Sequence, residues 1–163
     1  ALQIGYEQSY ESKWRQSSMK IIFVCTGNTC RSPMAEYLMR NYCKKKNLAI
    51  DVESRGLACS NGKAISDNSY TALQQIGIDA GGHRSQSFTL RDLFDADLII
   101  TMTQSHKDAI LYHFKAGDKV KTFDEMTGVG NVVDPYGFGL DEYLKCREQI
   151  ERGIPFIVQK LTK

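Results

Sequence analysis

Short apolar runs alternate with longer amphipathic stretches along this chain of 163 residues. The run Lys20-Ile21-Ile22-Phe23-Val24 is apolar and β-branched, which favours a buried strand. Other stretches repeat their apolar positions at helical spacing. The pattern predicts strands over 20–25, 50–55, 97–102 and 119–123, and helices over 32–46, 66–77, 104–113 and 140–161. We expect an interruption or kink in the last helix near Gly153-Ile154-Pro155, because proline lacks the N–H group that continues a helix.

Strands that alternate with helices predict an α/β fold with a parallel sheet covered on both faces. We expect a single domain with four strands in the order 2-1-3-4. Ligands of such sheets bind outside the carboxyl ends of the strands, at the point where the strand order reverses. The strand over 20–25 delivers its following loop to that point, so this loop is the first place to look for chemistry.

The composition of the chain limits the kinds of binding partner and the cellular compartment that we expect. The net charge is only +2, so nucleic acid is not an implied partner, and no apolar stretch approaches the roughly 18 residues of a membrane span. Five cysteines, an odd number, suggest a reducing environment and a cytoplasmic location. The polar segment 1–18 fits poorly with the rest, and we interpret it as an N-terminal extension or expression remnant without a catalytic role. The domain proper is expected over 19–163.

The loop after the first strand contains a cysteine and an arginine six positions apart, Cys25 and Arg31. Ser32-Pro33 after it is typical of a helix start, so the loop joins a strand end to a helix N-terminus. Backbone N–H groups there can point inward at an anion, aided by the helix dipole, and the arginine fork can hold two phosphate oxygens. The phosphate-binding residues expected are Thr26, Gly27, Asn28, Thr29, Cys30, Arg31 and Ser32.

The same placement makes Cys25 a candidate nucleophile. Inward N–H groups, a helix N-terminus and Arg31 favour the ionised sulfur, so we expect the pKa of the thiol to fall below that of free cysteine. A thiolate beneath a bound phosphoryl group is aligned to attack phosphorus without any metal. The alternative is an ordinary buried cysteine that ends a core strand, which the arginine and the turn residues argue against.

A carboxylic acid that protonates the leaving group is still needed, and Asp134 is the candidate. It lies in a glycine-rich loop over 128–139, between the predicted fourth strand and last helix, on the same carboxyl edge as the phosphate loop. The negative charge of a bound phosphate favours the protonated acid. Taken alone, an aspartate before proline is usually only a turn signal.

With these residues in place, the sequence resembles the low-molecular-weight protein tyrosine phosphatase family. The resemblance rests on Cys25 to Pro33 after the first strand and on Asp134-Pro135 late in the chain, and it extends from about Met19 to the C-terminus. It implies a phosphoprotein phosphatase with Cys25 as nucleophile, Arg31 as phosphate clamp and Asp134 as general acid. Phosphorylated proteins are then the substrates, and inorganic phosphate is both product and inhibitor.

The resemblance also assigns supporting roles around the nucleophile. Ser32 hydrogen-bonds toward the thiolate, beside a simpler role as helix cap, and Asn28 takes an unusual backbone conformation supported by Ser54 and His83. Relatives with two loop cysteines form a disulfide that protects the nucleophile from irreversible oxidation, which implies redox regulation through Cys25 and Cys30. The alternative is that the side chain of Cys30 only fills space beside the loop.

Substrate choice depends on Thr29 and Tyr136. Tyrosine-directed relatives commonly have a larger aliphatic residue in place of Thr29, whereas the bacterial arginine-directed branch carries threonine in the same Cys-Thr-Gly-Asn-Thr-Cys-Arg loop. The segment 57–62, directly after Ser54-Arg55-Gly56, contains no aromatic residue, although tyrosine-directed relatives often place an aromatic wall residue there. We therefore favour phosphoarginine over phosphotyrosine, although Tyr136 supplies one ring, as in many tyrosine phosphatases.

Two other classes are weighed against a phosphatase. An arsenate reductase shares this scaffold but needs further paired cysteines, and Cys59 and Cys146 are isolated. A non-catalytic phosphopeptide-binding module would need neither nucleophile nor acid. No cofactor is expected, and His106 and His113 belong to no cluster with zinc-ligand spacing, so no metal is expected either.

Overall fold

A four-stranded parallel sheet forms the centre of the protein. The structure is a computed structural model that describes residues 19–115 and 117–162. The strands run in the order β2-β1-β3-β4, which confirms both the predicted fold class and the predicted order. Their bounds are Met19–Cys25 (β1), Ile50–Gly56 (β2), Leu98–Thr101 (β3) and Val120–Thr122 (β4). The interpretation of residues 1–18 lies outside the described residues.

Helices connect and cover the strands. They are α2 (Arg31–Lys45), α3 (Asp67–Gln74), α4 (Leu90–Asp95), α5 (Gln104–Phe114), α6 (Phe123–Thr127) and α7 (Leu140–Leu161), with a 3₁₀ turn η1 (Gly117–Lys119). The four predicted helices are present within three residues at each end. The sequence analysis missed the short helices α4 and α6 and the turn η1.

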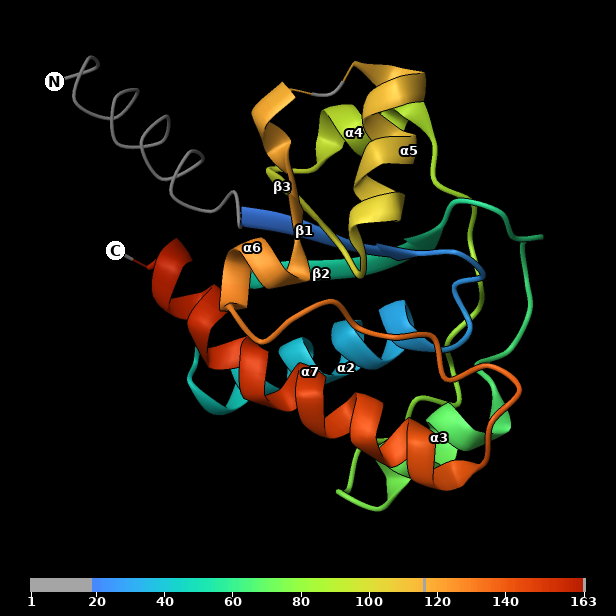
Figure 1. The fold of residues 1–163 in the computed structure, drawn as a ribbon. Helices are drawn as coiled ribbons and strands as arrows, with labels where there is room; N and C mark the ends of the chain where they lie inside the picture. The colour runs from blue at the N-terminus through green and yellow to red at the C-terminus, as the bar shows by residue number, and fades with distance from the viewer. Residues whose placement is uncertain (1–18, 116, 163) are drawn as a thin grey trace, which may run out of the picture.

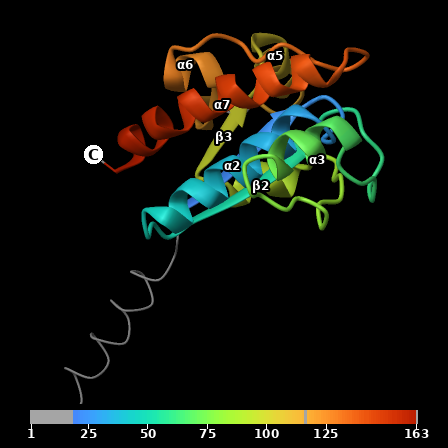
Figure 2. The ribbon, with the colours of Figure 1, turned by 90° about the horizontal axis from the view of Figure 1, so that it is seen from below.

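Alternating side chains of β1 pack against different helices on the two faces of the sheet. Ile21 and Phe23 join a core cluster with residues of α2, α3 and α7, whereas Ile22 and Val24 join a smaller cluster with α4 and α5. Figure 1 shows α2, α3 and α7 on one side of the sheet and α4 and α5 on the other, and Figure 2 looks onto the side that α2, α3 and α7 cover. Side chains of a strand point alternately to opposite faces, so one strand anchors both layers.

Helix α7 runs without interruption through Pro155, so the expected interruption near Gly153 is wrong, and a kink there stays a prediction. Gly153 lies against α6 instead, because a Cβ atom at this position would overlap the ring of Phe123. The glycine therefore permits close packing of two helices, and Pro155 sits on the exposed face of the helix. Among the described helices, none is both long enough and apolar enough to cross a membrane.

The carboxyl ends of the parallel strands lie at one edge of the sheet. Cys25, at the end of β1, pairs with Gly56 of β2, and Val24 pairs with Thr101 of β3. The N–H of Val132 donates to the carbonyl of Met102 just beyond β3, at 2.9 Å. The loop after β1 and the loop before α7 therefore meet, on the right-hand side of Figure 1.

Candidate active site

The loop between β1 and α2 is fixed by the side chain of Asn28. This residue is fully buried and has a φ of 54°, in the left-handed region that few non-glycine residues adopt. Its amide nitrogen donates to the hydroxyls of Ser32 and Ser54, each at 2.9 Å, and its amide oxygen accepts from the N–H of Gln86. The Nε2 atom of His83 lies 2.8 Å from the carbonyl of Asn28. The expected backbone conformation and its supporting network are thus both present.

Behind this network lies Glu36, a buried carboxylate that the sequence analysis missed. It accepts a hydrogen bond from Ser54 at 2.7 Å and pairs with Arg40 at 3.1 Å. Burial raises the pKa of the Glu36 carboxyl, against the opposing effects of Ser54 and Arg40. A hydrogen-bonded chain therefore runs from Glu36 through Ser54, Asn28 and Ser32 to the cysteine at the end of β1.

Cys25 lies at the bottom of the loop, 3% exposed, with its sulfur 2.9 Å from the hydroxyl of Ser32. Burial raises the pKa of the Cys25 thiol, and this effect outweighs hydrogen bonds from Ser32 and Asn28 and the charge of Arg31, all of which lower it. The expectation of a lowered pKa is therefore corrected. The expectation was based on the groups that stabilise the sulfur anion. It left out the free-energy cost of removing a charged sulfur from water.

Arg31 begins α2 and is also buried, at 4% exposure. One guanidinium nitrogen donates to the carbonyl of Val132 at 3.0 Å, and the other lies 3.6 Å from the carboxylate of Asp134. The Asp134 side chain is half exposed, and its other oxygen accepts from the N–H of Tyr136 at 3.1 Å. The loop over 128–139 that carries Asp134, here called the acid loop, is thereby held against the phosphate loop. Its carboxylate faces the guanidinium of Arg31.

These residues enclose a cavity of about 220 Å³ at the carboxyl edge of the sheet. It is lined by Cys25, Thr26, Gly27, Thr29, Cys30, Arg31, Asp134 and Tyr136. Within the described part of the chain, Tyr136 is the one aromatic residue of the lining. The structure therefore brings the predicted nucleophile, clamp, acid and both selectivity residues into one pocket, while the side chains of Asn28 and Ser32 lie behind it.

A comparison with known protein families identifies the family of the chain that forms this pocket. The sequence model described as low molecular weight phosphotyrosine protein phosphatase matches residues 20–163. The chain belongs to this family. It is accordingly a cysteine-dependent protein phosphatase, a hydrolase that acts on phosphoproteins.

Individual relatives of the phosphatase carry two different names. A Protein-arginine-phosphatase of Bacillus subtilis is 41% identical over 149 residues, covering 89% of this chain and 98% of the relative. The low molecular weight protein-tyrosine-phosphatase PtpB of Staphylococcus epidermidis is 41% identical over 126 residues, covering 77% and 86%. The crystal structure of a Bacillus subtilis YwlE mutant superimposes with a TM-score of 0.85 at 38% identity, covering 90% of this chain and 100% of that one.

The second loop cysteine of the phosphatase has its own contacts. The sulfur of Cys30 lies 3.5 Å from the hydroxyl of Ser66 and 3.6 Å from that of Tyr143, and both loop cysteines are buried free thiols. Burial and the neighbouring Cys30 raise the pKa of Tyr143 above its ordinary range. Cys30 therefore links the phosphate loop to α3 and α7, a structural role that leaves the redox role a prediction.

A histidine of α5 also reaches the phosphate loop, which the sequence analysis did not anticipate. The Nε2 atom of His106 lies 2.9 Å from the hydroxyl of Thr26, which lines the cavity. No motif signals this contact, because the two residues are 80 positions apart. Across residues 19–115 and 117–162, no group of three or more histidine, cysteine or acidic side chains is arranged to hold a metal ion.

Proposed function

We propose that this phosphatase acts on phosphoarginine in proteins in preference to phosphotyrosine. Relatives named Protein-arginine-phosphatase, from Bacillus subtilis and Geobacillus stearothermophilus, are 41% and 36% identical to the chain. Staphylococcal relatives named as tyrosine phosphatases are about as similar, with identities of 37–41% to the chain. Overall similarity therefore does not decide between the two substrates, and the proposal depends on the pocket.

The observation that carries the proposal is the position of Thr29 in the cavity wall. Its carbonyl accepts from the N–H of Ser66 at 2.9 Å, which fixes the backbone that presents the side chain. Thr26 adds a second hydroxyl to the same lining. A wall with two hydroxyls suits the N–H donors of a guanidinium, whereas a phenyl ring packs better on hydrocarbon.

The charge at the mouth of the pocket favours the same substrate. Asp134 lies half exposed beside the cavity, where a carboxylate can accept a paired hydrogen bond from a planar guanidinium. A phenol offers no such donor pair. In the protonated form that acts as general acid, one oxygen of Asp134 would still accept from the guanidinium while the other donates its proton to the departing nitrogen.

Phosphoryl transfer to Cys25 is the first chemical step of the proposed mechanism. Arg31 and the loop N–H groups hold the phosphoryl oxygens. The Cys25 thiol gives its proton to an oxygen of the bound phosphoryl dianion, and the resulting sulfur anion attacks phosphorus from the side opposite to the leaving group. The S–P bond forms while the P–N bond of phosphoarginine breaks, and the proton of Asp134 passes to the departing nitrogen. Ser32 stabilises the anionic sulfur by a hydrogen bond.

Hydrolysis of the cysteinyl phosphate completes the cycle. The carboxylate of Asp134, now deprotonated, accepts a proton from water as the water oxygen attacks phosphorus. The S–P bond breaks, the sulfur leaves with its electron pair, and inorganic phosphate is released. The hydrogen bond from Ser32 assists this departure, since it favours the anion over the bound sulfur.

The test compares kcat/KM for phosphoarginine and phosphotyrosine peptides of the same sequence. Thr29→Ile adds hydrocarbon to the wall and removes the hydroxyl, and we expect it to shift the ratio toward phosphotyrosine by about tenfold or more. Thr29→Val is the matched variant, because it removes the hydroxyl at nearly constant shape. A wild-type preference for phosphotyrosine, or an unchanged ratio in Thr29→Ile, would overturn the proposal.

Phosphotyrosine is the second candidate, favoured by the exposed ring of Tyr136 at the mouth of the cavity. A phenol in the pocket would pack against this ring, so Tyr136→Ala should weaken binding of phosphotyrosine peptides more than that of phosphoarginine peptides. Comparison of KM for the two peptides in this variant separates the candidates independently of Thr29.

A further inference from the structure

The start of helix α5 lies beside the phosphate loop because β3 and β1 are adjacent. Val24 pairs with Thr101, and the N–H of Met102 donates to the carbonyl of Val24 at 3.0 Å. The first turn of α5 follows within a few residues and carries His106. This histidine is 7% exposed and is not among the residues that line the cavity, so it reaches the site only through another side chain.

Both ring nitrogens of His106 are hydrogen-bonded. Nε2 lies 2.9 Å from the hydroxyl of Thr26, and Nδ1 lies 3.0 Å from the hydroxyl of Thr103. Thr103 is the N-cap of α5 and also accepts the backbone N–H of His106. The imidazole is therefore fixed to the rigid start of a helix on one side and to the phosphate loop on the other.

The electrostatic surroundings keep this ring uncharged. Burial lowers the pKa of His106 to about 4, and the charge of Arg31 acts in the same direction, while Asp134 opposes both. A neutral imidazole has one N–H donor and one acceptor nitrogen. It therefore suits two hydroxyl partners, one of which donates while the other accepts, and it adds no charge beside the phosphate site.

Thr26 is the residue through which this contact acts on the site. It directly follows Cys25, it is exposed, and it lines the cavity. Its carbonyl accepts from the N–H of Ala58 at 3.0 Å and approaches Gly56 so closely that a Cβ there would lie 2.8 Å from it. The backbone of Thr26 is thus held from the β2 side and its side chain from the α5 side.

We propose that His106 is a positioning residue of the phosphatase reaction: through the hydroxyl of Thr26, it holds the first turn of the phosphate loop in the arrangement that binds the phosphoryl group. The Asn28 network supports the middle of the loop, and His106 supports its beginning. The role concerns the phosphoryl group common to all substrates. It holds whether phosphoarginine or phosphotyrosine is preferred.

A double-mutant cycle tests the contact. Thr26→Val and His106→Phe each remove it from one side while preserving approximate shape, and each should lower kcat/KM for p-nitrophenyl phosphate about tenfold. Each should also raise the inhibition constant of inorganic phosphate. The double variant should have a kcat/KM no lower than that of the less active single variant, because the same contact can be lost only once. Losses that multiply to about a hundredfold would overturn the proposal.

Two matched variants separate positioning from general damage. Thr26→Ser keeps the hydroxyl and should recover most of the loss seen in Thr26→Val. His113→Phe makes the same replacement on the same helix, away from the phosphate loop, and should leave kcat/KM unchanged. Failure of Thr26→Ser to recover activity would contradict the proposal, and this outcome is readable even if His106→Phe folds poorly.

A spectroscopic measurement needs no substitution. Because the imidazole is coupled to the loop, its ring ¹⁵N resonances should shift when inorganic phosphate saturates the wild-type enzyme, although the ring does not touch the ion. Ring resonances that stay unchanged at saturation would refute the coupling. The readout is independent of substrate preference, so it also distinguishes a failure of this inference from a failure of the phosphoarginine proposal.

Discussion

The carboxylate of Asp134 lies 3.6 Å from the guanidinium of Arg31. The predicted acid and the predicted phosphate clamp therefore lie against each other in the wall of one cavity. The N–H of Tyr136 holds the other carboxylate oxygen, so the orientation of Asp134 depends on its own loop and not only on the ion pair.

Asp134→Asn should slow substrates with poor leaving groups much more than activated ones. The amide cannot donate a full proton, and only a basic leaving group needs one, so the loss should be about 10²–10⁴-fold for a phosphopeptide and far smaller for an activated aryl phosphate. Steady-state kcat on the two substrates measures the contrast. Equal slowing of both would mean that Asp134 does not act as the acid.

Arg31→Lys should lower kcat/KM by about 10²–10³-fold, because an ammonium group cannot hold two phosphoryl oxygens in the planar arrangement of a guanidinium. The substitution also removes the donor to the carbonyl of Val132. Cys25→Ser is the comparison: it should abolish turnover yet still bind inorganic phosphate, measured by calorimetry. Weak phosphate binding by both variants would assign a larger binding role to the sulfur than proposed.

Ser32→Ala should raise the pKa of Cys25 further, because the hydrogen bond from Ser32 is the largest of the effects that lower it. The rate of alkylation by iodoacetamide follows the fraction of ionised sulfur, so its pH profile should move to higher pH in the variant. Cys25→Ser gives the background from the other four cysteines. A profile that stays in place would show that Ser32 does not stabilise the anion.

The free energy of unfolding should fall as the pH drops from about 6.5 to about 4. Burial lowers the pKa of His106 to about 4 in the folded state, whereas the unfolded chain binds the proton near 6.5, so acid favours unfolding in this window. Glu36 works in the opposite direction, because burial raises its pKa. Urea titrations across this range should show a weaker pH dependence for His106→Phe than for the wild type.

Mild peroxide should inactivate the enzyme reversibly. Peroxide converts the Cys25 thiol to a sulfenic acid with release of water, and attack by the Cys30 thiol then forms the disulfide and releases a second water. Cys30 must first leave its contacts with Ser66 and Tyr143. Peptide mapping should find a Cys25–Cys30 link that dithiothreitol removes, and Cys30→Ser should lose this recovery. Irreversible loss in the wild type would rule the protective link out.

Much of the fold follows from local pattern. The buried strand β1 was predictable because its residues form a continuous apolar run, and the long helix α7 was predictable because its apolar positions recur at helical spacing. The short helices α4 and α6 have too few residues for such a pattern, yet each begins with a capping box, Thr89 with Asp92 and Thr122 with Glu125. The starts of these two helices are therefore indicated by polar residues, which a search for apolar periodicity does not detect.

The position of the loop between β1 and α2 was also predictable from local pattern, because Cys25 and Arg31 belong to one continuous motif. Glu36 and His106 were missed because their partners lie far away in sequence, 18 positions for Ser54 and 80 for Thr26. The direction of the pKa shift of Cys25 was also out of reach. It depends on how deeply the fold buries the sulfur, which no local motif specifies.

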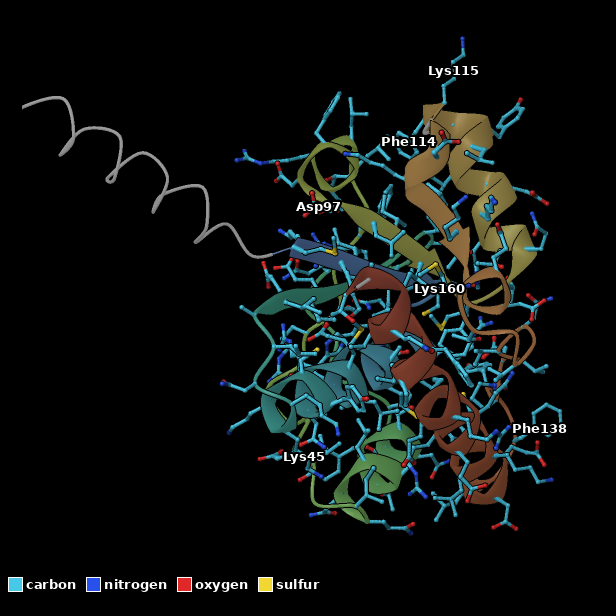
Figure 3. The ribbon with its side chains drawn as sticks, turned by 90° about the vertical axis from the view of Figure 1, so that its left-hand side faces the viewer. Lys45, Asp97, Phe114, Lys115, Phe138 and Lys160 are labelled. Atoms are coloured by element: carbon cyan, nitrogen blue, oxygen red, sulfur yellow. The ribbon has the colours of Figure 1, made fainter. Side chains whose placement is uncertain are left out.

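Val132 is bonded on both sides: its N–H donates to Met102 and its carbonyl accepts from Arg31. Beyond this point the loop presents Val133 and Phe138 to solvent, and Figure 3 shows Phe138 at the outer edge of the molecule. The part of this loop that faces Arg31 is therefore anchored to the sheet, whereas Val133 and Phe138 face solvent. Recruitment of different phosphoproteins can thus diversify by surface substitution without disturbing the reaction centre.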